Sequence, residues 1–316
     1  MFFLHFRSHS RNFAHIKTQS IGMKKLRFAI FGNTYQAKKT ACIEQLLGVL
    51  AERDASLLID KHFYEYLINE LNIYVTPQEV IEGDRFSADF VISMGGDGTF
   101  LEAARRVGSK GIPILGINMG RLGFLSDYQA EDITSAIEHI YNETFRLEER
   151  TVLMVEDEHG HIQGYPYALN EVAVLKQDNS SMISIDVEID GEFLTTYQAD
   201  GLIVNTSTGS TGYALSVGGP IIVPGTKIIG LVPVAPHSLT VRPLTLSADS
   251  EIRMKIKSRS HNFLLSVDGR SESAHEDTII TIKKAPYTVN VLKRGEGSFF
   301  STLREKLMWG ADSRER

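Results

Sequence analysis

The sequence predicts an α/β N-terminal domain built on a parallel sheet, followed by a β-rich, sandwich-like C-terminal domain. Up to about residue 147, short apolar runs alternate with segments of helical spacing, which is typical of a parallel sheet with helical crossovers. From about residue 148, apolar and polar residues alternate with period two, as in half-buried antiparallel strands. The length of 316 residues also favours two domains, since one domain holds roughly 150 residues.

The N-terminal domain, residues 23–147, is expected to consist of strands that are each followed by a helix. Strands are predicted at three short apolar runs, residues 26–31, 90–94 and 112–117. Helical spacing of apolar side chains follows each run, at residues 36–53, 100–107 and 130–141. Ligands of such sheets bind beyond the carboxyl ends of the strands, so the segments that follow these strands are the places to look for a site.

The C-terminal domain, residues 148–287, is expected to be built from hairpins. Apolar and polar residues alternate over residues 183–189, and Asp190-Gly191 directly after them is a strong hairpin turn signal. A second hairpin is predicted over residues 252–267. Hairpins with one apolar face bury that face against one another, which predicts the sandwich.

The two ends of the chain lead to separate expectations. Residues 299–309 carry apolar side chains near helical spacing, so the segment 288–316 is expected to dock back on the N-terminal domain. Residues 1–22 contain no acidic side chain, and Met23 opens a run that leads into the first predicted strand. We expect residues 1–22 to be a disordered extension rather than a targeting segment.

Composition excludes several classes of protein. Hydrophobic residues make up 42% and charged residues 23%, which predicts a packed core rather than a disordered chain. A net charge of −6 argues against broad binding to nucleic acid or to an anionic membrane. Cys42 is the only cysteine, so an intrachain disulfide is impossible, and we expect a cytoplasmic protein. No apolar run is long enough to cross a bilayer as a helix.

The segment Gly95-Gly96-Asp97-Gly98-Thr99 is the first candidate for chemistry. It lies between a predicted strand and a predicted helix, where the backbone N–H groups of Gly95, Gly96, Gly98 and Thr99 can bind phosphate. A carboxylate repels polyphosphate unless a cation or a reacting hydroxyl lies between them. Asp97 is therefore a candidate base or metal contact, and the alternative is that it caps the next helix. The usual P-loop and dinucleotide-binding glycine motifs do not occur.

The second candidate is the uncharged run from Gly201 through Gly218-Gly219-Pro220. Small hydroxyl and glycine residues are concentrated in it, at Thr208-Gly209-Ser210-Thr211-Gly212-Tyr213 and at Ser216. Apolar strand-like residues flank the run on both sides, which a flexible linker does not show. We interpret it as a turn that lines a ligand, with hydroxyl groups suited to ribose or phosphate.

Three further features are ambiguous on their own. Asn170-Glu171 precedes an apolar run, so the pair lies at a strand entrance or caps a turn. Asp268-Gly269 is also explained by a plain hairpin turn. Phe124 could stack on a base or could anchor its own loop.

Taken together and in this order, these segments resemble the NAD kinase family from Met23 to Trp309. The Gly-Gly-Asp-Gly-Thr pentapeptide is shared with diacylglycerol and sphingosine kinases and, in near form, with phosphofructokinase. The discriminating segments are Asn170-Glu171, the run from Thr208 to Pro220, Pro236-His237-Ser238-Leu239 and Arg242-Pro243-Leu244. Small departures are Gly212, where alanine is common, and Asn205 and Ser207, where the family often has serine and proline.

The resemblance implies a fold of the diacylglycerol-kinase and phosphofructokinase type with NAD bound between the domains. It implies that Asp97 is the catalytic residue and that Asp97 and Gly98 lie at the reacting ribose, with Phe124 against the adenine. Asn170 and Glu171 would hold the adenosine. The remaining implied NAD contacts are Thr208, Thr211, Gly212, Tyr213 and Ser216 along the dinucleotide, Asp200 and Ala235 near the nicotinamide, and Asp268 from the second hairpin.

The expected reaction is the ATP-dependent phosphorylation of the 2′-hydroxyl of the adenosine ribose of NAD, which gives NADP and ADP. A divalent ion, Mg²⁺, is expected to accompany ATP, and no protein side chain is assigned as its ligand. NAD and ATP are the expected small-molecule partners, and the resemblance implies a homodimer or homotetramer. The alternatives are a lipid or sugar kinase that shares the glycine turn, and a non-catalytic module that senses NAD(H).

Overall fold

The computed structural model describes residues 25–34, 40–120, 123–158, 160, 162–178, 181–293 and 299–310. The extension expected at residues 1–22 lies outside these described residues.

A five-stranded parallel sheet forms the centre of the N-terminal part, in the order β3-β2-β1-β4-β5. The bounds are β1 (Arg27–Gly32), β2 (Ser56–Asp60), β3 (Glu79–Ile81), β4 (Phe90–Gly95) and β5 (Ile114–Asn118). The three predicted strands are confirmed as β1, β4 and β5. The sequence pattern did not indicate β2 because its apolar stretch is only three residues long.

Helices cover both faces of this sheet. They are α1 (Thr40–Glu52), α2 (Lys61–Asn69), α3 (Asp97–Val107) and α4 (Ile133–Tyr141), with short 3-10 turns at Gly108–Lys110 and Ala130–Asp132. Apolar side chains of α1, α2 and α4 share one core cluster, whereas those of α3 belong to another. The predicted helices are confirmed within the described residues, and residues 36–39 of the first one lie outside them. However, α3 begins at Asp97 rather than near residue 100.

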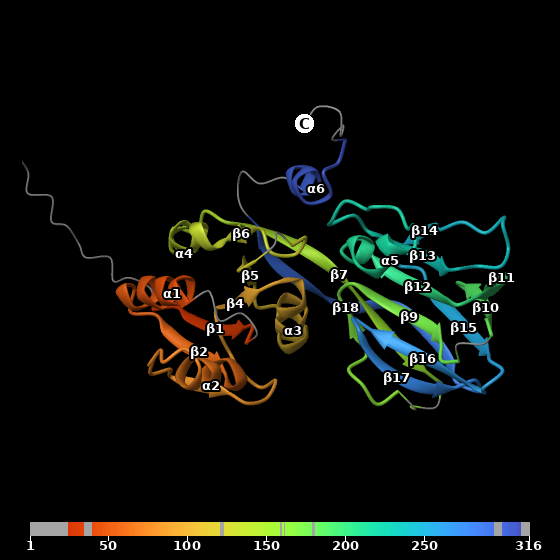
Figure 1. Ribbon diagram of the computed structural model, residues 1–316, viewed down its shortest axis with the longest axis horizontal. Helices are drawn as coiled ribbons and strands as arrows, with labels where there is room; N and C mark the ends of the chain where they lie inside the picture. The colour runs from red at the N-terminus through yellow and green to blue at the C-terminus, as the bar shows by residue number, and fades with distance from the viewer. Residues whose placement is uncertain are drawn as a thin grey trace, which may run out of the picture.

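The large sheet continues beyond the N-terminal part. Its further strands are β10 (Ile183–Ile189), β11 (Glu192–Ala199), β15 (Ile252–Lys257) and β18 (Ile279–Lys293), in the order β11-β10-β15-β18-β5. β18 pairs antiparallel with β7 (Arg146–Asp157) and reaches β5 at Val291 opposite Ile114. Two-residue strands β6 (Tyr128–Gln129) and β8 (Tyr167–Ala168) flank β5 and β7. The long strands β7 and β18 run between the two halves of the molecule (Figure 1).

An antiparallel six-stranded sheet packs against this extension, in the order β14-β13-β12-β9-β16-β17. Its strands are β9 (Glu171–Lys176), β12 (Gly201–Thr206), β13 (Ile228–Val234), β14 (Leu244–Ser247), β16 (Asn262–Val267) and β17 (Arg270–His275). One core cluster contains Ile185 and Met254 of the first sheet with Leu202 and Leu265 of the second. The predicted sandwich is therefore confirmed.

One predicted hairpin is confirmed and one is wrong. β10 and β11 pair across Asp190-Gly191 as expected. Residues 252–267 do not form a hairpin, because β15 pairs with β10 and β18 while β16 pairs with β9 and β17. Both strands bury alternate side chains in the same core from opposite sheets, and a period of two cannot distinguish that arrangement from a hairpin.

The C-terminal helix α6 (Phe299–Leu307) is confirmed and returns toward the N-terminal part. It lies above the junction of the two halves in Figure 1, and Phe299 lies with its ring centroid 6.4 Å from that of Phe124. No helix in the described ranges is long and apolar enough to cross a membrane.

Candidate active site

The glycine turn joins the end of β4 to the start of α3. An added Cβ at Gly95 would overlap the side chain of Thr99, so only glycine lets the first turn of α3 fold back this closely. At Gly96 and Gly98 an added Cβ would meet nothing within 4 Å. The missing side chains there leave the backbone open to a ligand at a helix N-terminus, which is the arrangement that binds phosphate.

The carboxylate of Asp97 points to the loop that follows β5. Its Oδ2 accepts a hydrogen bond from the backbone N–H of Phe124 at 3.0 Å, and its Oδ1 accepts one from Leu125 at 3.1 Å. The N-cap of α3 is Gly96, and no side chain caps that helix. The alternative that Asp97 caps the helix is therefore wrong. The side chain stays 32% exposed, so its orientation is fixed while a substrate can still reach it.

Lys306 of α6 lies against the same carboxylate. Its Nζ is 3.6 Å from Asp97 Oδ2 and 4.2 Å from the centroid of the Phe124 ring. Phe124 is only 7% exposed, and its ring packs against Phe299, which fits the anchoring role; the adenine contact stays a prediction. No feature of the sequence indicated that Lys306 reaches Asp97, because the two residues lie 209 positions apart.

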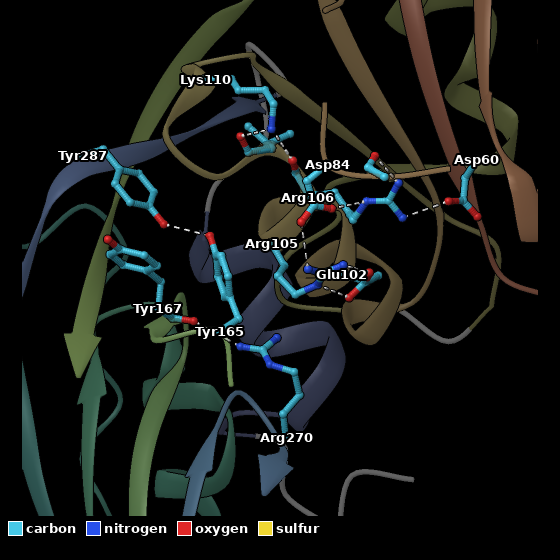
Figure 2. A network of polar contacts seen from close by, with 12 residues as sticks. Asp60, Asp84, Glu102, Arg105, Arg106, Lys110, Tyr165, Tyr167, Arg270 and Tyr287 are labelled. Carbon is cyan, nitrogen blue, oxygen red and sulfur yellow. Dashed lines mark hydrogen bonds and ion pairs between the residues drawn. The ribbon is translucent and has the colours of Figure 1, made fainter. Parts of the chain in front are cut away.

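Polar contacts also fix the helix that carries Asp97 (Figure 2). The buried Arg106 contacts Asp84 at 2.7 Å and Asp60 at 3.1 Å, and it donates to the carbonyl oxygen of Gly83 at 2.7 Å. On the other side, the guanidinium of Arg105 lies 5.8 Å from the centroid of the Tyr165 ring. Helix α3 is therefore tied both to the N-terminal sheet and to the second half of the chain.

The structure brings together two segments that the sequence singled out separately. An added Cβ at Gly209 would overlap the backbone of Asn170. An added Cβ at Gly212 would lie 2.8 Å from Glu171 Oε2 and 3.4 Å from Asn170 Nδ2. The entrance of β9 and the turn after β12 thus form one compact surface. Gly212, where the family often has alanine, leaves more room beside Glu171 than an alanine side chain would leave.

Two acceptor atoms on this surface have no partner. Asn170 Oδ1 and Glu171 Oε2 are buried and accept no hydrogen bond from the described residues. Burial, and then the neighbouring Asp268 carboxylate, raise the pKa of Glu171 to about 7, against the opposing effect of the Tyr213 backbone N–H. Buried acceptors normally have donors, so these atoms suit a ligand that brings hydroxyl or amino groups.

The raised pKa of Glu171 makes stability depend on pH. Between pH 4.5 and about 7 the unfolded chain ionises at Glu171 while the folded chain keeps its proton, so stability falls as pH rises through this window. We expect Glu171→Gln to be more stable than the parent at pH 8, by up to about 3 kcal/mol, and close to it at pH 4.5. Urea unfolding of the ligand-free protein at several pH values measures this difference. Glu192→Gln, on the exposed hairpin, is the control, and an equal pH dependence in both variants would contradict the assignment.

Asp268 lies at the turn between β16 and β17, with a left-handed backbone at φ +47°. Its carboxylate accepts backbone hydrogen bonds from Leu169, Asn170 and Glu171 at 2.7, 2.8 and 3.1 Å. Burial raises the pKa of Asp268 in spite of these donors. The predicted hairpin turn is confirmed, and in the ligand-free chain this side chain holds the Asn170-Glu171 backbone in place.

A buried arginine supports the turn after β12. Thr208 accepts a hydrogen bond from Arg150 Nη1 at 3.1 Å, and Arg150 Nη2 lies 2.5 Å from Glu148 Oε1. Thr211 donates to the carbonyl oxygen of Thr208 at 3.3 Å. Tyr213 is 38% exposed and begins the short helix α5 (Tyr213–Ser216), which Ser216 ends. The sequence did not indicate Arg150, because its position beside Thr208 depends on the pairing of distant strands.

Asp200 and Ala235 lie together at the other end of β12. Asp200 donates its backbone N–H to Val234 and forms an ion pair with Lys176 at 2.8 Å. Ala235 has a left-handed backbone at φ +44°. Because a strand rises about 3.4 Å per residue, the six residues of β12 place this pair roughly 20 Å from Thr206, where the turn with Thr208 begins.

A helix N-terminus is open to phosphate, and the fixed carboxylate of Asp97 lies beside it. Across the domain junction lies the polar surface with the two acceptors that have no partner among the described residues. The fold and the site together define a nucleotide-dependent phosphotransferase. Two family models match the chain. The ATP-NAD kinase N-terminal domain matches residues 28–145, and the ATP-NAD kinase C-terminal domain matches residues 169–294. The chain belongs to the NAD kinase family and is an enzyme of that family.

Known relatives agree with this assignment. The NAD kinase of Bacteroides fragilis is 54% identical over 92% of this chain and 100% of its own length, and that of Porphyromonas gingivalis is 42% identical over 92% and 99%. The structure of an Archaeoglobus fulgidus NAD kinase in complex with ATP is similar at a TM-score of 0.70 and 25% identity, over 90% of this chain and 99% of that one. Yeast NADH kinase complexed with NADH shares the fold at a TM-score of 0.81 and 24% identity, over 92% and 90%.

Proposed function

We propose that this chain transfers the γ-phosphoryl group of ATP to the 2′-hydroxyl of the adenosine ribose of NAD, giving NADP and ADP. The observation that carries the proposal is the fixed and partly exposed carboxylate of Asp97, which lies between the open glycines Gly96 and Gly98. The relatives named NAD kinase support the choice of substrates. Formation of NADP from NAD and ATP by the purified chain tests it. Phosphorylation of lipid or sugar acceptors but not of NAD would favour the alternative kinases.

We propose that Asp97 orients the 2′-hydroxyl and accepts its proton late in the transfer. A carboxylate is too weak a base to ionise a sugar hydroxyl before the reaction, and positioning dominates phosphoryl transfer. The two backbone N–H donors from Phe124 and Leu125 support this role, because they fix both carboxylate oxygens. General-base assistance then contributes roughly 10²–10⁴ in rate.

Mg²⁺ fits this site as a partner of the ATP phosphates. Within the described ranges no group of three or more His, Cys, Asp or Glu side chains could hold a metal. One carboxylate beside a phosphate-binding turn is nevertheless the arrangement in which Mg²⁺ takes most of its ligands from phosphate and water. Asp97 is the side chain of this turn that would contact the ion. When bound, the ion would neutralise phosphate charge.

Asn170→Ala is expected to weaken NAD binding by about tenfold or more and to leave ATP binding nearly unchanged. The Asn170 side chain lies on the β9 surface with an unpaired Oδ1, and an unmade hydrogen bond to a bound polar group costs about 1–3 kcal/mol. Calorimetric titration of each nucleotide separately measures both affinities. Equal losses for NAD and ATP would remove Asn170 from the NAD site.

We further propose that the chain acts in the cytoplasm as a homodimer or homotetramer. Exposed apolar side chains support self-association, with Leu239 at 87% and Phe193 at 62% exposure, since such groups often mark protein interfaces. Light scattering after size-exclusion chromatography measures the subunit number, and a monomer at micromolar concentration would contradict the proposal.

A further inference from the structure

The ion pair between α6 and the reactive turn has a consequence for catalysis. Lys306 Nζ lies 3.6 Å from Asp97 Oδ2, which is beyond hydrogen-bond distance, and its side chain remains 29% exposed. Both Asp97 oxygens already accept backbone hydrogen bonds. The ammonium therefore neutralises the carboxylate without being required to hold it. A flexible lysine with three N–H donors in such a position can change partners.

The position of Lys306 coincides with the place where phosphoryl charge would arrive. In the proposed reaction, Asp97 contacts the 2′-hydroxyl that attacks the γ-phosphorus. Any phosphoryl group transferred to that hydroxyl passes within a few ångströms of the carboxylate. A negative carboxylate alone would repel it, whereas a cation beside the carboxylate favours the charge that spreads over the phosphoryl oxygens during transfer.

The surroundings of α6 leave room for a phosphorylated ligand. Thr302, one turn before Lys306, lines a cavity of about 300 Å³ together with Phe124, the ion pair of Lys293 with Asp127 and the ion pair of Arg146 with Glu148. This volume is at the lower end of those that hold small molecules. The phenyl ring of Phe124 lines the cavity, and the Lys306 ammonium lies over the same ring. With 29% of its side chain exposed, the cation lies near the surface rather than inside the protein core.

We propose that Lys306 is a catalytic residue of this enzyme; this inference rests on the proposed function. During the reaction the Lys306 ammonium moves away from Asp97 and itself binds the γ-phosphoryl group that is being transferred. The ribose 2′-oxygen forms a bond to the γ-phosphorus, and the bond between that phosphorus and the β,γ-bridging oxygen breaks with its electron pair passing to ADP. The 2′-hydroxyl proton passes to Asp97. Lys306 contributes charge and N–H donors to the phosphoryl oxygens.

Lys306→Met tests this role, because methionine keeps an aliphatic stem over Phe124 while removing the charge. We expect kcat/KM for ATP to fall about a hundredfold, the size of effect produced by removing one donor to a developing oxyanion. The affinity for NAD and the midpoint of thermal unfolding should stay close to those of the parent. Lys306→Arg should recover at least about a tenth of the parental kcat/KM, because it restores a cation.

The matched control is Arg304→Ala, which removes an exposed cation from the same helix and should leave kcat/KM for ATP within about twofold. Parental activity in Lys306→Met would overturn the proposal, as would increased activity, which is the result expected of an inhibitory contact. A parallel loss of NAD affinity and thermal stability would assign Lys306 a purely structural role and would also overturn it.

A failure of the proposed function can be distinguished from a failure of the proposal for Lys306. If the parent chain makes no NADP, Lys306 is tested by calorimetric titration with Mg-ATP alone. A loss of ATP affinity in Lys306→Met, but not in Arg304→Ala, supports phosphate binding by Lys306. Equal affinities in the parent and both variants would overturn it.

Discussion

Asp97→Asn is expected to lower kcat by at least about a hundredfold while NAD still binds. Asparagine has the shape of aspartate but cannot accept a proton from the ribose hydroxyl. Its amide can accept only one of the two backbone N–H groups that Asp97 satisfies, so unfolding should become easier by about 1 kcal/mol. Steady-state turnover, NAD titration and urea unfolding of one preparation separate these three effects.

Glu102→Gln is the matched control for this variant, because it removes a carboxylate from the same helix on its exposed side, where Glu102 pairs with Arg105. Its turnover should stay within about twofold of the parent, in line with the small contribution of exposed ion pairs. Near-parental turnover in Asp97→Asn would remove Asp97 from the mechanism. A collapse of stability without a specific loss of kcat would make the residue structural.

Gly209→Ala is expected to weaken NAD binding by at least about tenfold and to destabilise the fold by about 1–3 kcal/mol. The added methyl group would overlap the backbone of Asn170, and backbone atoms cannot rotate away as the end of a side chain can. The turn after β12 and the entrance of β9 must therefore separate. NAD titration and thermal unfolding report the two consequences.

Gly48→Ala provides the contrast, because it makes the same chemical change where an added Cβ meets nothing within 4 Å. Gly48 lies inside α1, where alanine stabilises a helix by about 0.5–1 kcal/mol relative to glycine. This variant should keep parental NAD affinity and unfold at a higher temperature. If Gly209→Ala behaved in the same way, the close approach of Gly209 and Asn170 would not be needed for binding.

Much of the N-terminal fold could be predicted because the signals are local. The strand before Gly95 and the helix after it follow from an apolar run, a glycine turn and helical spacing, and the structure has β4 and α3 there. The exact start of α3 at Asp97 could not be predicted, because glycine-rich turns do not mark where helical backbone begins. The short strand β2 carried too few apolar residues to stand out.

The pairing of strands in the second half of the chain could not be predicted from local sequence patterns. In residues 252–267 alternate side chains are apolar and buried. Their period does not specify a partner strand, so β15 and β16 entered different sheets. Hydrogen bonding between distant segments decides that choice, and the sequence carries no local signal for it.

The sequence by itself determined the family, the glycine turn with Asp97, and the two polar segments at Asn170-Glu171 and after β12, because residue types and spacing are local properties of the chain. Only the tertiary structure decided that Gly209 closes onto Asn170, that Arg150 supports Thr208, and that Lys306 reaches Asp97. Each of these contacts joins residues 39 to 209 positions apart, and such contacts form only when the packing of two sheets and the return of α6 bring the segments together. The position of the carboxylate that we propose as catalytic was therefore predictable, whereas the cation beside it was not.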